Sequence, residues 1–236
     1  MKTRNGLKTL IFLLLSAGMV FIFNNCTKSG DDSTPTPTPV TDVDGNVYHT
    51  VTIGTQVWMV ENLKTTKLND GTAIPQVTDT SWRSLSTPAY CYYGNDAGWK
   101  PIYGPLYNWW AVNSGKLAPA GWHVATESDW NLLVTTLGGD TVAGGKLKST
   151  GTVESITGLW LSPNKGATNA SGFTAFPGGY RYYSIHGIDQ INRYSYWWTS
   201  TSFGTSTAYC FFIRYDETTV NRDNSEKHTG YTVRCV

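Results

Sequence analysis

The feature that most constrains this chain is an abrupt change of composition at Cys26. Residues 9–23 are almost wholly apolar and follow a basic start. Residues 27–40 are polar and proline-rich and end in TPTPTPV, a composition that favours an extended polyproline II chain of about 3.1 Å per residue. Because neither segment has the pattern of a globular core, we expect the folded domain to lie in residues 41–236.

The apolar run is shorter than the roughly 20 residues that a membrane-spanning helix needs, and its flanks are typical of a secretory signal peptide. Its end at Cys26 resembles a bacterial lipoprotein signal, in which the cysteine becomes the lipidated first residue. Phe23 and Asn25 depart from the usual residues of that signal. We therefore predict a signal peptide in residues 1–25 and a tether in residues 26–40. The alternative is an uncleaved N-terminal anchor.

Both a lipidated Cys26 and an uncleaved anchor would attach the chain to a membrane. With lipidation, the acyl chains insert into the membrane, which is therefore the expected partner. Asp31 and Asp32, just after Cys26, resemble the acidic signals that direct some Bacteroidetes lipoproteins to the cell surface. The expected location is the outer membrane, facing outward. Removal of residues 1–25 removes three basic and no acidic residues. The mature chain then has a small net negative charge and no basic stripe, so a nucleic-acid partner is not expected.

The domain is rich in rings and poor in charge. The chain has 10 Trp, 14 Tyr, 8 Phe and 24 Gly, and only 15% of its residues are charged, against a usual value of about 25%. So many aromatic side chains bury too much surface for a disordered chain. The composition favours a β-rich extracytoplasmic domain with ordered loops, whose core includes Trp122, Trp130, Trp197 and Trp198.

Local patterns predict the main elements. Residues 47–53 and 56–63 alternate apolar and polar residues around Gly54–Thr55, which predicts an antiparallel hairpin. Closing strands are expected at 194–202, 207–216, 219–223 and 230–236.

Two helices are expected. The first is short and lies within residues 106–113. The second follows Thr126, which has the spacing of an N-cap with Asp129, and its apolar positions fall on one face until Gly138–Gly139 ends it. Residues 141–150, which contain two adjacent glycines, suggest only a broken helical turn.

Several blocks occur in an order that resembles the Fibrobacter succinogenes major paralogous domain, which is common in surface lipoproteins of Bacteroidetes and Fibrobacteres. The resemblance covers about residues 42–236. Its blocks are VTIGTQVWMVENL, YGPLYNWWAVN, GWHVATESDW, GFTAFPGGYR, YWWTSTS and GYTVRCV.

Some of these blocks are more distantly similar to the C-type-lectin-like fold of formylglycine-generating enzymes. That resemblance implies an α+β fold, with two short helices packed on small antiparallel sheets and a long loop region near 177–197. It does not carry over the activity, because the reactive cysteine pair of those enzymes is not reproduced by motif.

The domain has three cysteines, Cys91, Cys210 and Cys235. The resemblance implies that the position of Ala118 is often cysteine and pairs with the cysteine matching Cys235. That partner is missing here, and an odd number of thiols leaves at least one unpaired or joins two chains. Cys210 and Cys235 lie on expected neighbouring strands and are the candidate disulfide, although spacing alone does not decide the pairing.

No motif for catalysis, cofactor or metal binding is present. The four histidines lack zinc-ligand spacing, and His123 is interpreted as a packing residue. Neither a nucleophile elbow nor a phosphate-binding loop occurs. The acidic residues near 216–226 lack a calcium-loop pattern. We therefore expect no cofactor and no metal.

Two functions of different classes remain. The first is a non-catalytic binding or adhesion domain for a surface glycan or protein ligand, with Tyr182, Tyr183, Tyr194 and Tyr196 as the binding residues, since loops on a rigid scaffold commonly carry binding sites. The second is an extracytoplasmic enzyme that modifies polysaccharide or protein. An enzyme requires paired carboxylates in a cleft or an activated thiol, and the sequence favours the binding domain.

Overall fold

The computed structural model describes residues 39–182 and 187–236. These residues belong to one compact unit. The predicted lipidation site Cys26, and the tether as far as residue 38, lie outside the described residues. Among the described residues no helix is both long enough and apolar enough to cross a bilayer.

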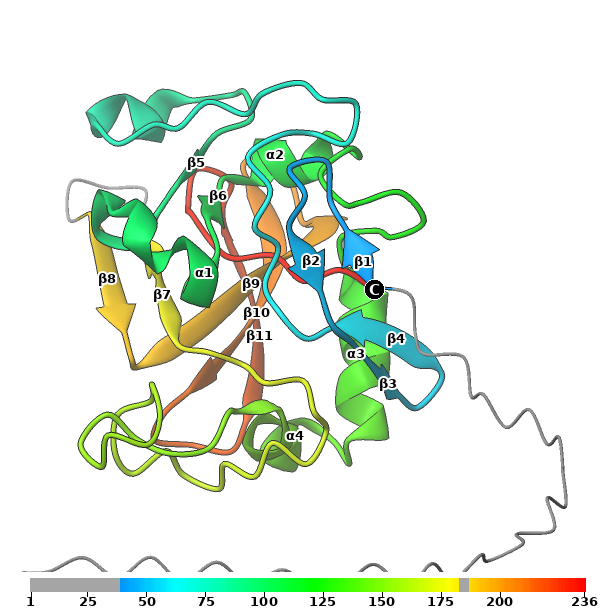
Figure 1. Cartoon of the computed structure of the whole chain (residues 1–236), viewed down its shortest axis with the longest axis vertical. Coiled ribbons are helices and arrows are strands. Elements are labelled where there is room, and N and C mark those ends of the chain that lie inside the picture. Colours follow the sequence, from blue (N-terminus) through cyan, green and yellow to red (C-terminus); the bar gives the residue numbers. More distant parts are fainter. Residues whose placement is uncertain (1–38, 183–186) are drawn as a thin grey trace, which may run out of the picture. The chain divides into compact units, whose positions relative to one another are not determined.

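The described residues form a mixed α+β fold, which confirms the predicted class at that level (Figure 1). The strands are β1 Val40–Thr41, β2 Val47–Tyr48, β3 Thr50–Ile53, β4 Gln56–Met59, β5 Tyr90–Cys91, β6 Leu106–Tyr107, β7 Gly178–Arg181, β8 Ile188–Ile191, β9 Tyr194–Ser202, β10 Thr207–Arg214 and β11 Val220–Glu226. The α-helices are α1 Lys100–Tyr103, α2 Trp109–Asn113, α3 Glu127–Thr136 and α4 Asp140–Leu147. Short 3-10 turns cover Thr80–Ser84, Tyr93–Asn95 and Ala97–Trp99.

A five-stranded sheet with the order β11-β10-β9-β7-β8 forms the centre of the fold. Its strands pair antiparallel, except that β7 runs parallel to β9. The pairs β1-β2, β3-β4 and β5-β6 form three separate two-stranded sheets. The predicted hairpin at Gly54 is confirmed as β3 and β4, which pair from Thr50–Met59 to Ile53–Gln56.

Two large hydrophobic clusters build the core. One joins α3 and α4 to β9 and β10, and at its centre Trp130 stacks on Phe211 with ring centroids 5.2 Å apart. The other joins α2 to Trp198 and Tyr231. Trp130, Trp197 and Trp198 are fully buried as predicted, whereas Trp122 is only partly buried at the edge of the second cluster.

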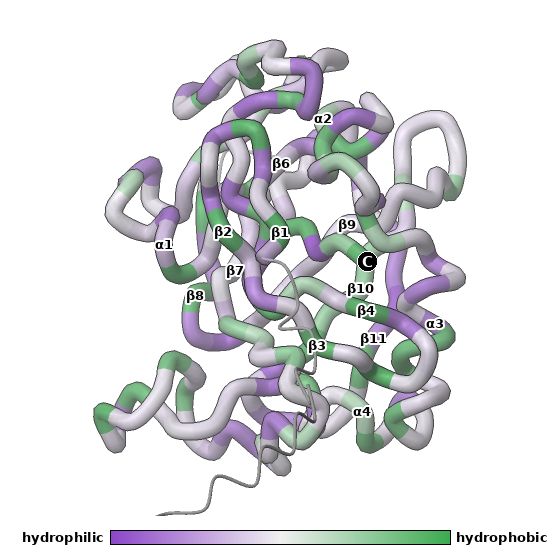
Figure 2. Tube along the Cα trace, turned by 45° about the vertical axis from the view of Figure 1, so that its right-hand side comes forward, coloured by the Kyte–Doolittle hydropathy of each residue, from purple (hydrophilic) through white to green (hydrophobic). Residues whose placement is uncertain are grey.

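Helix α3 forms as its sequence predicts. The Thr126 hydroxyl accepts a hydrogen bond from the Asp129 backbone N–H at 3.1 Å, and the Asp129 carboxylate accepts one from the Thr126 N–H at 2.8 Å. This capping box satisfies two N–H groups that lack partners within the helix. Hydropathy alternates along α3 (Figure 2), as expected of a helix with one packed face.

Helix α4 is continuous where the sequence predicted only a broken turn. Its glycines lie against neighbouring backbone, because a Cβ on Gly144 would come within 2.7 Å of the Thr218 carbonyl and one on Gly145 within 2.4 Å of the Gly166 carbonyl. Glycine costs a helix interior about 0.5–1 kcal/mol. Close packing of helix and loop backbones offsets that cost here.

The prediction of a long loop near 177–197 is wrong. Much of this region is the β7–β8 hairpin, followed by the start of β9. Gly179 has φ +64°, and a Cβ there would approach the Asp189 carbonyl within 2.3 Å. The glycines that suggested loop freedom instead allow two strands to approach closely.

The final segment, residues 230–236, is not a regular strand of a sheet. It runs through the interior and bonds to a different element at almost every residue (Figure 1, red). Tyr231 pairs with Tyr107, the Leu63 N–H donates to the Val233 carbonyl, and the Met59 N–H donates to the Cys235 carbonyl. The segment therefore links β4, β6 and β9.

The Arg234 side chain lies at the centre of these links and is 1% exposed. Its guanidinium donates to the Asn62 Oδ1 at 2.7 Å, to the Met59 carbonyl at 2.8 Å and to the Phe173 carbonyl at 2.9 Å. A fourth bond reaches the Thr174 carbonyl at 3.2 Å. Burial lowers the pKa of Arg234 to about 9, so the group is still charged at neutral pH. A buried cation is stable only when such acceptors surround it.

We predict that Arg234→Met lowers the free energy of unfolding by roughly 3–5 kcal/mol, because it leaves several buried oxygens without donors. Urea denaturation of the two proteins measures the difference. Arg83→Met, at an exposed arginine, is the control and should change stability by less than about 0.5 kcal/mol. Equal, small losses at both positions would contradict the assigned role of Arg234.

Candidate functional site

The central sheet offers its two faces to different neighbours. Alternate residues of β9 and β10, such as Trp197 and Phe211, pack into the cluster that contains α3 and α4. The residues between them point to the opposite face. On that face Tyr194 pairs with Arg214, and Tyr196 pairs with Phe212. All four are only partly buried, so this end of the sheet carries an incompletely covered group of aromatic side chains.

Five rings make up this group, which we call the tyrosine face: Tyr180, Tyr182, Tyr194, Tyr196 and Phe212. Tyr196 is the central ring. Its centroid lies 4.8 Å from Phe212, 5.1 Å from Tyr180 and 5.6 Å from Tyr194. Tyr182 extends the group beyond Tyr180 at 6.1 Å. Strands β7, β9 and β10 therefore hold four of the rings in a fixed arrangement, and Tyr182 directly follows β7.

A pocket of about 350 Å³ opens at the edge of the tyrosine face. Tyr180, Tyr182, Gly187 and Asp189 line it. Its described lining residues combine two aromatic rings with one carboxylate, which is the mixture of apolar wall and few polar groups that small-ligand sites usually show.

Charged groups border the same face. The Arg214 guanidinium lies 5.5 Å from the centroid of the Tyr194 ring and is held by Asp216, with Nη2 2.8 Å from Oδ2. The hydrogen bond to Asp216 raises the pKa of Arg214, and the same bond lowers the pKa of Asp216. Burial raises the pKa of Tyr180. The site therefore offers neutral phenols next to a fixed ion pair.

The predicted binding residues are placed differently from one another. Tyr182 is 39% exposed, and Tyr194 is half-buried at the outer end of the face. Tyr196 also lies on the face, but its ring packs against three neighbours of the face and against Tyr231 at 4.7 Å. Tyr183 lies outside the described residues. Tyr182 and Tyr194 are thus the more accessible pair.

The sequence interpretation missed Tyr180, Phe212 and Asp189. The available signal was the two-residue period of strands. Tyr194 and Tyr196 are two positions apart on β9 and share one side of it, and Tyr182, directly after β7, is two positions from Tyr180. The loop interpretation of residues 177–197 hid that period.

The cysteines of the described residues are all free and buried. The candidate Cys210–Cys235 disulfide is therefore not present. Cys210 Sγ lies instead 3.6 Å from the Ser225 hydroxyl, and Cys235 belongs to the irregular final segment, which bridges to Val124 and not to β10. Burial raises the pKa of Cys91 to about 11 and that of Cys210 to about 12, and it also raises the pKa of Cys235.

His123 was interpreted as a packing residue, and this is wrong. Its side chain is 57% exposed, and its Nε2 lies 3.0 Å from the Asp129 carboxylate that caps α3. In the part of the chain that the structure describes, no three His, Cys, Asp or Glu side chains are grouped to hold a metal ion. In the acidic segment near 216–226, which lacks a calcium-loop pattern, Asp216 and Glu217 both lie close to the Arg214 guanidinium.

Comparison with known proteins gives one match. No curated protein and no solved structure is significantly similar to the chain. A family model described as the Fibrobacter succinogenes major domain matches residues 51–236. That range contains every residue of the tyrosine face and the buried Arg234 network. The chain belongs to the Fibrobacter succinogenes major domain family.

Proposed function

We propose that this protein is a surface lipoprotein whose domain binds a glycan through the tyrosine face and does not catalyse a reaction. The observation that carries the proposal is the partly exposed group of rings on β7, β9 and β10, next to a pocket of about 350 Å³. A folded domain usually buries rings this close together. Here the strands hold them at the surface.

The chemistry of the face suits a neutral sugar. A pyranose ring has an apolar face that packs on aromatic rings, and phenol groups add hydrogen bonds at the rim. The Asp189 carboxylate lines the pocket and accepts hydrogen bonds from hydroxyl groups more strongly than a neutral acceptor does. A protein ligand is the alternative outcome of the binding experiment below.

The anchor is part of the proposal. Cys26 ends the apolar run, and acyl chains on this residue attach the protein to the outer membrane. Two or more chains give stable attachment, since each buried methylene contributes about 0.8 kcal/mol. Residues 27–40 then form an extended spacer. The spacer holds the domain away from the bilayer, where it meets surface glycans.

A C-type-lectin-like topology is the fold that we propose within the α+β class. Support comes from the small antiparallel sheets, from the packing of α3 and α4 on the central sheet, and from the hydrogen bonds between β4 and the final segment. An experimental structure, superposed on C-type lectin domains, tests this relationship.

The enzyme alternative has weaker support. A catalytic thiol needs access and a lowered pKa, whereas all three described thiols are buried and have raised pKa values. No paired carboxylates lie with the rings in the pocket, where Asp189 is the one acidic residue among the described lining residues.

We predict that Tyr182→Ser and Tyr194→Ser each weaken glycan binding about two- to tenfold, because each removes one aromatic contact worth about 0.5–1.5 kcal/mol. Titration of the displayed full chain against a glycan array measures the effect, and melting temperature is recorded in parallel. Phe203→Ser is the matched control, since Phe203 is 52% exposed and follows the other end of β9. Losses equal to that of the control, or losses that follow melting temperature, would reject the tyrosine face. Binding to matrix proteins in place of glycans would assign a protein ligand.

Cys26→Ala should abolish incorporation of a fatty-acid analogue and release the protein from the membrane fraction, because the thiol is the proposed acylation site. Metabolic labelling of cells followed by gel analysis measures both. Continued labelling of the variant, or no labelling of the wild type, would contradict lipidation.

The thiols of the folded domain should react with a thiol probe at pH 8 far more slowly than after denaturation, since the thiolate is the reactive form and burial opposes it. Counting modified cysteines with time, in buffer and in denaturant, checks this. Rapid modification of one thiol in the native protein would contradict this prediction and would favour the enzyme alternative.

A further inference from the structure

The chain between α4 and β7, residues 148–177, is a long loop (Figure 1, yellow-green). Loops of this length without regular structure are uncommon inside compact domains and usually serve a function. In one turn of this loop Ile156 is 93% exposed, the largest exposed fraction among the large hydrophobic side chains of the described residues. Val153, in the same turn, is 40% exposed. The loop therefore presents two aliphatic side chains to the surroundings.

The backbone of Ile156 is strained. Its φ is +58°, in the left-handed region that a β-branched residue rarely adopts. Thr174 has a similar φ of +54°, but its hydroxyl donates to the Gly172 carbonyl at 3.2 Å and accepts from the Asn169 side-chain amide at 3.0 Å. The hydrocarbon side chain of Ile156 can form no such bonds. Backbone strain that internal bonds do not explain is often found where a residue serves a function.

Hydrogen bonds hold the turn in one shape. The Ile156 N–H donates to the Val153 carbonyl at 3.0 Å, and the Thr157 N–H donates to the Thr152 carbonyl at 3.1 Å. The Val153 N–H donates to the carbonyl of Trp160 at 2.8 Å, and the Trp160 side chain is fully buried in the core. Because the turn is already ordered, it loses little conformational entropy when its tip contacts a partner.

The polar side chains of the turn have partners within the loop. The Ser155 hydroxyl lies 2.9 Å from the Thr152 hydroxyl and 2.5 Å from the Thr157 hydroxyl. Glu154 is the one acidic residue in positions 151–158, and its Oε2 accepts a hydrogen bond from the Ser162 N–H at 2.9 Å. Polar groups that are bonded to one another lose less free energy on leaving water than unpaired groups do.

A cation and an aromatic ring lie next to the stem of this loop. The Leu161 N–H donates to the Asn192 carbonyl at 2.8 Å, so the stem contacts the turn between β8 and β9. The exposed Arg193 follows in that turn, and its guanidinium lies 5.7 Å from the centroid of the Tyr215 ring. Arginine and tyrosine are side chains that favour the interface between a membrane and water.

A lipid bilayer is the partner that this turn fits best. A protein interface usually buries about 800 Å² on each side and centres on aromatic or arginine side chains in pockets. Two aliphatic side chains on an exposed turn do not supply such a surface, whereas fluid acyl chains need no matching shape. The proposed anchor also keeps a bilayer within reach, since residues 27–38 in polyproline form extend only about 37 Å.

We propose that Ile156, with Val153 beside it, inserts into the surface of the membrane to which Cys26 attaches the chain. This inference rests on the membrane attachment in the proposed function and not on glycan binding. Burial of one isoleucine side chain is worth roughly a ten- to hundredfold preference for the bilayer. The anchor supplies the high local concentration that makes so small a gain effective. The contact sets the orientation of the domain on the membrane.

A fluorescent probe in the turn tests the insertion. The full-length lipidated protein carries Val153→Cys, labelled with a nitrobenzoxadiazole group, and the thiols of the folded domain are buried and do not compete. In vesicles of phosphatidylethanolamine and phosphatidylglycerol the probe should brighten, because it enters apolar surroundings. The same probe at Val47→Cys, on β2, is the control, since Val47 is 52% exposed. An equal response at both positions would overturn the proposal.

A second substitution separates insertion from folding. Adding Ile156→Asn should weaken insertion roughly tenfold, and it should leave the melting temperature unchanged or raise it, because asparagine tolerates a positive φ. Brightening that survives Ile156→Asn would overturn the proposal. Protein that sediments with the vesicles while its probe at residue 153 stays dark would overturn the insertion alone. Protein that does not sediment with them would contradict the anchor and the insertion together.

Discussion

The buried charge of Arg234 is the constraint on which the rest of the domain depends. Its guanidinium needs acceptors on every side, and these come from Asn62, Met59 and the Phe173–Thr174 carbonyls. Asn62 also accepts from the Trp197 indole N–H and donates to the Tyr103 carbonyl. Segments far apart in the sequence are thereby fixed around one cation. The buried cation of Lys148 is stabilised in the same way, because its ammonium group donates hydrogen bonds to three backbone carbonyls.

Packing also explains why one face of the central sheet is only partly covered. The sheet is anchored on the side of α3 and α4 by large rings such as Trp130 and Trp197. On the other side the final segment covers part of the sheet through Tyr231, which stacks on Tyr196. The final segment covers the sheet only as far as Tyr231. The rings of the tyrosine face beyond it, with Tyr182 the outermost, remain partly exposed. The tyrosine face is thus the part of the sheet that the described residues cover only partly.

Local patterns in the sequence predicted local structure well. The hairpin at Gly54, the strand at 194–202 and the capped helix after Thr126 each follow from a period or a cap within a few residues. Two of the errors occur where glycine allows distant segments to pack closely, at Gly144 in α4 and at Gly179 in β7. Those contacts leave no trace in the local pattern.

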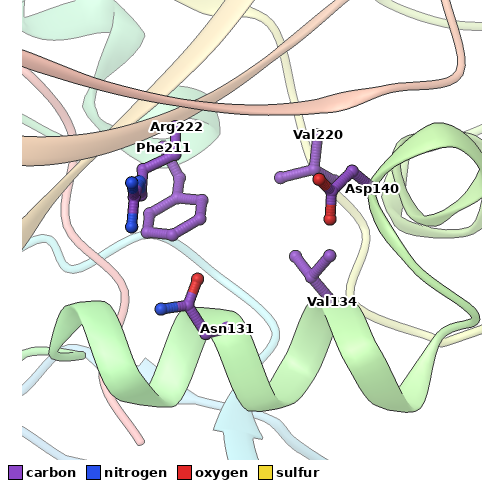
Figure 3. Close-up of a pocket in the computed structure, with 6 residues that line it drawn as sticks. All are labelled: Asn131, Val134, Asp140, Phe211, Val220 and Arg222. Atoms are coloured by element: carbon purple, nitrogen blue, oxygen red, sulfur yellow. The ribbon is translucent and has the colours of Figure 1, made fainter.

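For the candidate site too, the sequence indicated individual residues but not how they are arranged in space. Tyrosine abundance led to the prediction of Tyr182, Tyr183, Tyr194 and Tyr196 as binding residues. It did not indicate the ring packing around Tyr196 or the position of Asp189 in the pocket with Tyr180. A second hollow joins residues of α3, α4, β10 and β11 (Figure 3), so no single stretch of sequence could indicate it. The pairing of the thiols could not be predicted either, because the path of the final segment determines which residues surround Cys235.

That route has a consequence for how the domain matures. Arg234 and its neighbours are synthesised after every segment that they join, and their contacts span more than 170 positions of sequence in the case of Asn62. Such long-range contacts make folding slow, because the chain must close large loops before they form. The acceptors near residues 59–62 and 173–174 therefore have no donor until residue 234 has been synthesised. The domain therefore cannot complete its fold until the segment that carries Arg234 has left the ribosome, however early its hairpins and helices form.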